Sequence, residues 1–292
     1  MKITELFERG EFVVSAEVGP PKGFHVEHLL EEAKTYLSGI TAVNVTDNQS
    51  SVMRLGSLAM CKALKDEGLT PIYQLTCRDR NRIALQSDLL SAAMFGIENL
   101  LLLTGDHTKL GDHPQAKPVF DLDSVSLIHA VKKLEEGVDL GGNELIGEAP
   151  KFAKGAVVSP CSDSVDAQLA KMERKVMAGA DYFQTQAVFE PEKFIKFMEK
   201  AKQFGKPVQV GIIIPKSAGM AKFMNNNVAG IHVPDEMIEE LKKDKEKTKA
   251  GITGVEIAAR IIKECKPYCQ GVHIMALGWE SKVPELLKAA GI

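Results

Sequence analysis

The 292-residue sequence predicts an α/β protein in which eight parallel strands and the helices between them close into a single (βα)8 barrel. Eight apolar segments alternate with helical patterns along the chain, and this alternation is typical of parallel strands joined by right-handed crossovers. The runner-up fold is a doubly wound open sheet. Its dinucleotide signature is absent, because the turn after the first strand reads GPPKG rather than G-x-G-x-x-G.

The strand candidates are short runs rich in branched and aromatic residues. They span residues 12–18, 40–46, 70–76, 99–105, 154–160, 182–189, 207–213 and 271–278. In the fourth run, four consecutive leucines end at once in Thr-Gly-Asp. A continuous apolar run of this kind indicates a strand covered on both faces, as in a barrel surrounded by helices.

Amphipathic segments with apolar spacing near 3.6 fill the intervals between the strands, and many of them end in Gly or Pro. The long interval at residues 214–270 predicts extra helices between the seventh and eighth strands. Its charged run, EELKKDKEKTKAG, predicts a solvated helical face and a turn. Because no other repeat and no low-complexity linker interrupts the pattern, we expect residues 1–292 to form one domain.

Composition and charge exclude several classes of function. The formal net charge is only -3 and the sequence pI is about 6.2, which does not suit a protein that neutralises nucleic-acid phosphates. No run approaches the roughly 18 apolar residues that a membrane span needs, and the N-terminus has no unbroken apolar core of a signal peptide. Five scattered cysteines suit reduced thiols. We therefore expect a cytoplasmic protein without nucleic-acid or membrane partners.

The carboxyl ends of the strands carry the polar residues, where barrels of this kind place their catalytic groups. Glu17 is the strongest candidate for a catalytic residue, because it interrupts an otherwise apolar strand just before a Gly-Pro-Pro turn. Burial at the barrel mouth is expected to raise its pKa and suit it to general acid catalysis. The alternative is an acid paired with a neighbouring Lys or Arg for stability. Buried acids without a role or a partner are rare, which favours a functional role.

Polar groups that could bind a ligand lie at the ends of two further strands. Asp106 follows the leucine run, and it could anchor a ligand or simply serve as an N-cap or Asx-turn residue. Gln186 lies in the sixth strand, where an amide must find partners and can offer both a donor and an acceptor to a heterocycle.

The remaining candidates are cations and thiols. Arg174 and Lys175 could form a solvated helix face or could clamp phosphates. Lys216 follows the seventh strand and could form a Schiff base if it is desolvated. Cys265 and Cys269 are four residues apart, but a proline lies between them and no nearby pattern completes a zinc site, so we expect no metal.

Six motifs occur in order along nearly the whole chain: SAEVGPPKG, VNVTDN, QLTCRDRNR, LLLTGD, ERKVMAGADYFQTQ and VGIIIP. In this order and spacing the sequence resembles the methylenetetrahydrofolate reductases, flavoenzymes built on a (βα)8, or TIM, barrel. By that resemblance Glu17 corresponds to the general acid, Asp106 to the residue that contacts the folate and tunes the flavin, and Gln186 to the pterin-binding amide. The positions that correspond to flavin-binding residues are Thr46, Gln74, Leu103, Thr104, Gly105, Asp106, Arg174 and Lys175, the last two near the flavin phosphates. The implied cofactor is FAD, with FMN as the alternative.

The resemblance implies hydride transfer from reduced flavin to 5,10-methylenetetrahydrofolate, which gives 5-methyltetrahydrofolate for one-carbon metabolism. The five-membered ring of the substrate must first open to an electrophilic iminium. Protonation of N10 promotes that opening and needs a carboxylic acid that is still protonated near neutral pH, as a desolvated Glu17 would be. An anionic Asp106 would accept hydrogen bonds from the pterin and favour the cationic iminium.

The sequence departs from the family pattern at several positions. Members often have a His where Gln74 stands, and an aromatic residue after the seventh strand, where this chain has Ala218 and Gly219. The segment VVSPCSDS also lacks the usual aromatic and His, and the ending HIMALGWESKVPELL is similar to members from anaerobic bacteria that work beside a partner subunit. The resemblance therefore implies an oligomer or hetero-complex in which an iron-sulfur partner supplies electrons, with NAD(P)H as the alternative donor. Two other functions remain open: a Schiff-base aldolase using Lys216, and a non-catalytic barrel subunit.

Overall fold

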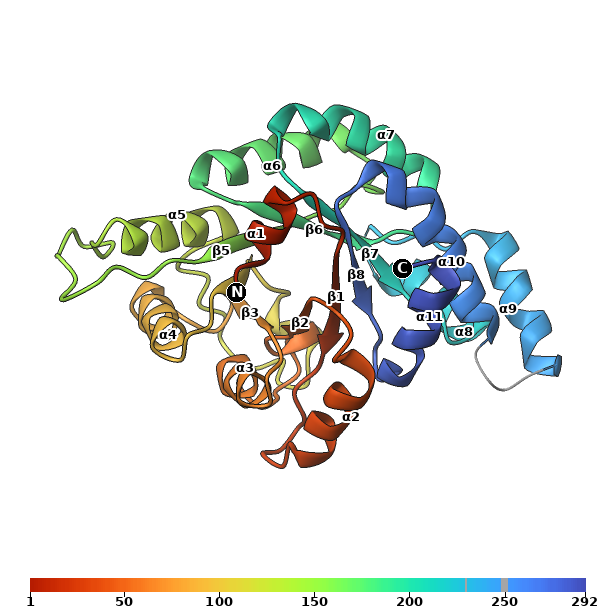
Figure 1. Cartoon of the computed structure of the whole chain (residues 1–292), viewed down its shortest axis with the longest axis horizontal. Coiled ribbons are helices and arrows are strands. Elements are labelled where there is room, and N and C mark those ends of the chain that lie inside the picture. Colours follow the sequence, from red (N-terminus) through yellow and green to blue (C-terminus); the bar gives the residue numbers. More distant parts are fainter. Residues whose placement is uncertain (229, 248–251) are drawn as a thin grey trace.

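Eight parallel strands pair in sequence order, and the last pairs with the first, so that the sheet closes into a barrel (Figure 1). The computed structural model describes residues 1–228, 230–247 and 252–292. The predicted (βα)8 fold is confirmed. The strands are β1 (Val13–Val18), β2 (Ala42–Val45), β3 (Pro71–Thr76), β4 (Asn99–Leu103), β5 (Ala153–Val158), β6 (Tyr182–Ala187), β7 (Val208–Ile213) and β8 (Gly271–Met275).

Helices surround the barrel on its outer side (Figure 1). The α-helices are α1 (Ile3–Glu8), α2 (Glu27–Leu37), α3 (Ser57–Asp66), α4 (Arg82–Met94), α5 (Ser124–Glu135), α6 (Val165–Ala178), α7 (Pro191–Ala201), α8 (Ala218–Asn227), α9 (Asp235–Lys247), α10 (Ile252–Cys265) and α11 (Val283–Ala290). Short 3-10 helices occupy Gln49–Ser51, Thr108–Leu110, Lys202–Phe204, Lys266–Tyr268 and Glu280–Lys282. Within the described ranges, no helix combines the length and the apolar character that crossing a bilayer requires.

The interval between β7 and β8 contains the extra helices that its length predicted. α8 and α9 contact each other, and α9 also contacts α10, beside which it lies at the rim of the molecule (Figure 1). The predicted solvated run covers residues 239–251. Its first part lies in α9, as expected, and residues 248–251 lie outside the described residues.

The four leucines of β4 are divided between two apolar layers. Leu100 and Leu102 pack outward in the cluster that the helices share with the barrel wall. Leu101 packs inward with residues of other strands, and Leu103 joins that inner cluster from a partly buried position. Alternate side chains of a strand point to opposite faces, so a strand covered on both faces must be apolar throughout. The run thus carries the chain to the barrel mouth, where Asp106 follows.

The barrel interior changes in character along its axis. At the amino ends of the strands the inner cluster is apolar, and α1 closes it with Ile3 and Leu6. Towards the carboxyl ends, inward positions of the strands carry polar side chains that are at most 3% exposed: Ser15, Asn44, Gln184, Gln209 and His273. Barrel interiors are usually filled by branched apolar residues, so this buried polar layer is unusual. It lies directly beneath the residues that open to solvent.

Candidate active site

The mouth of the barrel holds a cavity of about 420 Å³ at the carboxyl ends of the strands. This volume is within the range of about 300–1,000 Å³ that is typical of small-molecule sites. Eight of the ten predicted site residues line it: Glu17, Gln74, Leu103, Thr104, Gly105, Asp106, Lys175 and Gln186. The two others, Thr46 and Arg174, are absent from its lining.

Glu17 lies near the end of β1 with its side chain 12% exposed. Its Oε1 is 3.3 Å from Gln74 Nε2 and 3.5 Å from His273 Nε2, and its Oε2 is 3.5 Å from Gln49 Nε2. Among the described residues no Lys or Arg forms an ion pair with this carboxyl group, which removes the stabilising-pair alternative. A nearly buried acid with only uncharged or titratable neighbours is a candidate for proton transfer.

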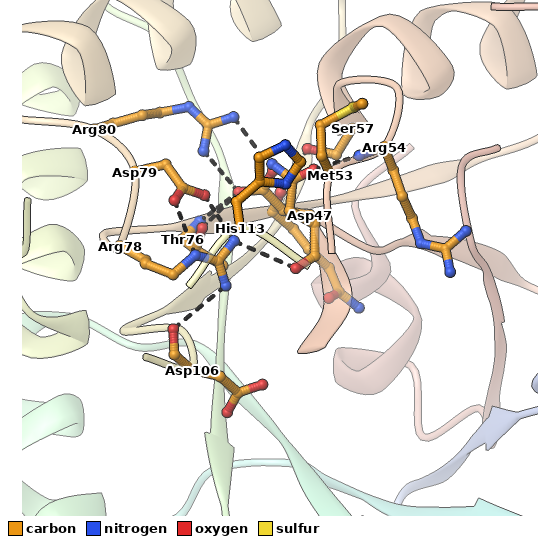
Figure 2. Close-up of polar contacts among 12 residues, drawn as sticks. Asp47, Met53, Arg54, Ser57, Thr76, Arg78, Asp79, Arg80, Asp106 and His113 are labelled. Carbon is orange, nitrogen blue, oxygen red and sulfur yellow. Dashed lines mark hydrogen bonds and ion pairs between the residues drawn. The ribbon is translucent and has the colours of Figure 1, made fainter. Parts of the chain in front are cut away.

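Asp106 is exposed at the start of the loop after β4. Its carboxylate accepts no hydrogen bond from the described part of the chain, and the following helical turn is capped by His107 instead. The N-cap and Asx-turn alternatives therefore find no support. The Asp106 backbone carbonyl is 3.5 Å from the guanidinium of Arg78, and the carboxylate points away from that group (Figure 2). Asp106 is thus held by its backbone and presents a free carboxylate to the cavity.

Arg78 ties together three loops at the mouth. Its guanidinium is almost fully buried and pairs with the carboxylate of Asp79, while Nη2 also donates to the carbonyl of Asn48. Close by, the buried carboxylate of Asp47 accepts hydrogen bonds from Arg80 and Thr76 (Figure 2). These contacts fix the β2, β3 and β4 exits relative to one another.

Gln186 lies where the pairing of β6 with β7 is irregular, between Gln184 and Ala187. Thr185 bridges this irregularity, because its hydroxyl oxygen accepts from the amide of Gly211 at 2.8 Å. Bulges of this kind re-aim side chains beside active sites. The Gln186 side chain lines the cavity and makes no hydrogen bond with the described residues, so its amide is available to a ligand.

The predicted flavin-binding positions on β2, β3 and β4 lie at one side of the mouth. The hydroxyl of Thr46 is buried and has no hydrogen-bond partner in the ranges that the structure describes. Gly105 has a φ of +91°, and a Cβ there would lie 3.1 Å from Thr76 Cβ and 3.2 Å from Arg78 Cβ. Only glycine suits this backbone and this close approach. Thr46 thus has an unused hydrogen-bonding group at the exit of β2, and Gly105 lets the β4 exit lie close against the β3 exit at the rim of the cavity.

Lys175 and Arg174, which the resemblance places near the flavin phosphates, lie in different parts of the structure. Lys175 lines the mouth cavity and donates to the carbonyl of Val157 at 2.6 Å. Burial lowers the pKa of this ammonium group to about 8. Arg174 is exposed and lines a different cavity between α5 and α6, with His129 and Met177. Successive helical residues point about 100° apart, so of these two cations Lys175 faces the mouth cavity and Arg174 does not. The joint clamp stays a prediction, which this geometry does not support.

The residues of the other hypotheses lie away from the cavity. Lys216 donates to the carbonyl of Leu277 at 2.5 Å and lies over the ring of Trp279, outside the cavity lining. This placement gives no support to a Schiff-base aldolase. The thiol of Cys269 is 3.4 Å from the carbonyl oxygen of Cys265, and both cysteines are buried.

Sequence reasoning missed the buried polar layer and Arg78. His273 contacts both Ser15 and Glu17, although it is 256 residues away from Glu17 in the chain. The signal was present, because Ser15 is two residues before Glu17 and so shares its face of the strand, and His273 interrupts an apolar strand in the same way as Glu17.

A (βα)8 barrel with a nearly buried carboxyl group, an unpaired carboxylate and an unpaired amide, as far as the described residues show, around one cavity has the features of a barrel enzyme that acts on a small molecule. A sequence model of the methylenetetrahydrofolate reductase family matches residues 2–291, so the chain belongs to this family. The resemblance seen in the motifs is confirmed.

Individual relatives agree with this assignment. The 5,10-methylenetetrahydrofolate reductase of Salmonella typhimurium is 27% identical over 87% of this chain and 82% of its own length. Methylenetetrahydrofolate reductase 2 of Schizosaccharomyces pombe is 27% identical over the whole chain, which spans about half (48%) of that relative. A solved structure of a Clostridium thermocellum protein, described as binding two copies of 5-methyl-5,6,7,8-tetrahydrofolic acid, shares the fold with a TM-score of 0.69, 14% identity and coverage of 99% and 98%.

Proposed function

We propose that this chain is a flavin-dependent reductase that converts 5,10-methylenetetrahydrofolate to 5-methyltetrahydrofolate. The observation that carries the proposal is the placement of Glu17 at the floor of the mouth cavity, without a cationic partner among the described residues and in the same cavity as Asp106. Family membership supports it, and so do relatives that carry the name of this activity. The structural neighbour that binds 5-methyltetrahydrofolate supports a folate ligand.

Three polar residues of the mouth have a role in this reaction. Glu17 donates a proton to N10 of the folate, which opens the five-membered ring and leaves a cationic iminium on the substrate. Asp106 stabilises that cation and accepts hydrogen bonds from pterin N–H groups, because its carboxylate is free. Gln186 pairs with the pterin through its amide, which can both donate and accept.

The residues of the mouth fit a flavin. The backbone at Gly105 and the ammonium of Lys175 would hold it, with Gln74, Leu103 and Thr104 beside them. The unpartnered hydroxyl of Thr46 lies at the exit of β2, outside the lining of the cavity. When bound, the flavin supplies the hydride. Lys175 suits the phosphate of FAD or FMN equally, and we propose FAD because of the family.

We further propose that electrons reach the flavin from an iron-sulfur partner subunit rather than directly from NAD(P)H. The described residues that line the cavity include no Phe, Tyr or Trp, so nothing there stacks on a nicotinamide ring. Phe223 of α8 is exposed and lies outside the lining. Steady reduction of the flavin by NADH in the isolated chain, at rates that match turnover, would contradict this proposal.

The reductase half-reaction tests the main proposal. The purified yellow protein is reduced anaerobically with dithionite, mixed with methylenetetrahydrofolate, and followed by flavin absorbance. Fast reoxidation is expected in the wild type, and Glu17→Gln should slow it by roughly 10²- to 10⁴-fold without loss of flavin, because general acid catalysis is worth about that much.

The matched control is Glu8→Gln, which removes an exposed carboxylate of α1 at the closed end of the barrel. It should leave the rate unchanged. A colourless protein, or a reduced flavin that is indifferent to the folate, would contradict the proposal and favour a non-catalytic barrel subunit.

A further inference from the structure

Arg78 is a charged side chain that is buried at the mouth of the barrel. It lies in the segment that follows β3, its side chain is 2% exposed, and it lines the mouth cavity together with Gly105 and Asp106. Of the arginines among the described residues, it alone lines this cavity. A guanidinium has five N–H donors and no acceptor, so the partners of these donors show what the residue can bind.

Three of the five N–H groups are engaged by the protein. Nε donates to Oδ1 of Asp79 at 2.9 Å, and Nη2 donates to Oδ2 of the same carboxylate at 2.6 Å, which makes a bidentate ion pair along one edge of the guanidinium. Nη2 also donates to the backbone carbonyl of Asn48 at 3.3 Å. These contacts leave Nη1 on the side of the guanidinium that faces away from the Asp79 carboxylate.

Nη1 carries the two remaining N–H groups. One of them faces the backbone carbonyl of Asp106 at 3.5 Å, the limit of hydrogen-bonding distance, and the other has no acceptor among the described residues (Figure 2). A buried donor without an acceptor costs free energy, and the cost is larger for a charged group. Because Arg78 lines the mouth cavity, a ligand bound there can supply the missing acceptor.

Arg80, two residues further along the chain, has a different set of contacts. Its Nη1 and Nη2 are 2.7 Å and 3.2 Å from the carboxylate of Asp47, and its Nε is 2.9 Å from the carboxylate of Asp88. Every nitrogen of this guanidinium therefore faces a carboxylate, and Arg80 does not line the cavity. Arg80 has only structural contacts, whereas Arg78 pairs along one edge and keeps one nitrogen for the cavity.

The position of Arg78 indicates which ligand it meets. A Cβ on Gly105 would lie 3.2 Å from Arg78 Cβ, so Arg78 packs directly against the exit of β4. The segment from Leu103 to Gly105 at this exit is proposed to hold the flavin. The flavin ring has carbonyl oxygens, and a charged N–H group makes a stronger hydrogen bond to such an oxygen than a neutral one does.

We propose that Arg78 binds the flavin through Nη1, which donates a hydrogen bond to a carbonyl oxygen of the isoalloxazine ring while the opposite edge stays paired with Asp79. The identity of this ligand rests on the proposed function, and the inference adds Arg78 to the flavin-binding positions that the resemblance implies. Reduction raises the electron density of the ring. The charged donor therefore binds the reduced ring more tightly than the oxidised ring and raises the reduction potential of the bound flavin.

Titration with two flavins separates a ring contact from a phosphate contact. The flavin is removed from the yellow protein, and the return of colour with FAD shows that the protein is intact. FAD and riboflavin, which has the ring but no phosphate, are then titrated by fluorescence. Arg78→Met should raise both dissociation constants by the same factor, roughly tenfold to a hundredfold, because a hydrogen bond to a charged group is lost.

Arg78→Lys tests the same contact in a protein that keeps the buried charge. Its ammonium can pair with Asp79, but it has no second nitrogen for the cavity, so flavin affinity should fall as it does in Arg78→Met. A loss of affinity for FAD but not for riboflavin would assign Arg78 to a phosphate and overturn the proposal. Unchanged flavin affinity with a higher half-saturating folate concentration would assign it to the folate and overturn the proposal as well.

Asp79→Asn is the matched structural control. It removes the charge that pairs with the far edge of Arg78, leaves Nη1 in place, and alters a residue outside the cavity lining. If Arg78 served only to hold the loops, Asp79→Asn would weaken flavin binding as much as Arg78→Met. The proposed contact predicts no comparable loss in Asp79→Asn. Arg9→Met, which removes an exposed guanidinium paired with Glu11, should leave flavin affinity unchanged.

The reduction potential of the bound flavin is the second readout, and it does not depend on the affinity for riboflavin. It is measured anaerobically against a reference dye. Arg78→Met should lower it by about 30 mV for each factor of ten by which the reduced flavin is weakened more than the oxidised flavin, since the couple transfers two electrons. A potential that stays the same or rises in Arg78→Met would overturn the proposal.

The failure of this inference can be told apart from the failure of the proposed function. If the Arg78 variants lose flavin affinity as expected but the reduced wild type does not react with the folate, the proposed reaction fails and the flavin contact stands. If the wild type reacts and the Arg78 variants keep both the affinity and the potential of the wild type, the function stands and the role of Arg78 is refuted.

Discussion

The two ends of the barrel interior are built from the same strands in the same inward register, yet their side chains are opposite in character. At the amino ends, Val13, Ile72 and Tyr182 form an apolar plug beneath α1. Two residues further along β1 and β3 come Ser15 and Gln74, which belong to the polar layer and the mouth. Side chains at positions i and i+2 of a strand share a face. The comparison therefore shows that the same strands can place residues that stabilise the fold at one end of the barrel and residues of the candidate active site at the other.

The largest expected effect removes apolar volume from the closed end. Ile72→Ala should lower the free energy of unfolding by about 2–5 kcal/mol, because it deletes a fully buried side chain and leaves a cavity. Denaturant unfolding measures this effect, and the reoxidation rate per folded molecule should stay unchanged. Ile83→Ala, at an exposed position of α4, is the control and should change stability by less than about 0.5 kcal/mol. A large loss of rate per folded molecule in Ile72→Ala would show that the two ends are not separable.

The reciprocal change removes a charge from the mouth. Asp106→Asn should lower the folate-dependent reoxidation rate by roughly ten- to a hundredfold, because a hydrogen bond to a charged group is worth about 1.5–3 kcal/mol. Its melting temperature should not fall, since the carboxylate accepts no hydrogen bond from the described residues. Asp66→Asn, which alters an exposed pair with Lys62 on α3, is the matched control. An Asp106→Asn protein that unfolds more easily at an unchanged rate would mean that this carboxylate is structural.

The partly buried charge of Lys175 should lower the free energy of unfolding. Its pKa is lowered to about 8 in the fold, whereas the unfolded chain keeps the proton up to the usual value of 10.5. The unfolded state therefore binds more protons between these values, so the stability of the flavin-free protein should rise with pH across that window. At pH 7, Lys175→Gln should stabilise the flavin-free protein by on the order of 1–3 kcal/mol.

Flavin affinity should move in the opposite direction. If the charged ammonium holds a phosphate, affinity falls as pH rises through about 8, by roughly tenfold between pH 7 and pH 9. Fluorescence titration of the flavin measures this, and Lys175→Arg should abolish the pH dependence because arginine stays charged. An affinity that does not change with pH in the wild type would remove Lys175 from the phosphate site.

The smallest effect is expected at Arg174. Because this side chain lines a separate cavity, Arg174→Ala should change the flavin dissociation constant by less than about threefold, far less than a stacked or paired arginine would. The same titration decides the point, with Lys175→Gln as the comparison at pH 7. A loss in Arg174→Ala as large as that in Lys175→Gln would restore the joint clamp that the sequence suggested.

Periodicity alone determined the fold and the outline of the site. The alternation of apolar runs and amphipathic segments predicts eight parallel strands, and the run that ends at Leu103 predicts a strand covered on both faces. An acid inside such a strand and a carboxylate just after one are visible in a linear pattern, which is why Glu17 and Asp106 could be named before the fold was known. Five of the eight strands end one to three residues before the predicted position, whereas β1, β3 and β7 end where predicted.

Only the tertiary structure decided which of these residues meet. Ser15 and His273 are 258 positions apart, and they lie side by side because closing the barrel pairs β1 with β8. Arg174 and Lys175 are neighbours in the chain, yet they face different cavities because each helical residue turns the side chain by about 100°. A sequence lists which groups a chain carries, but the closure of the sheet and the rotation of the helix determine their partners.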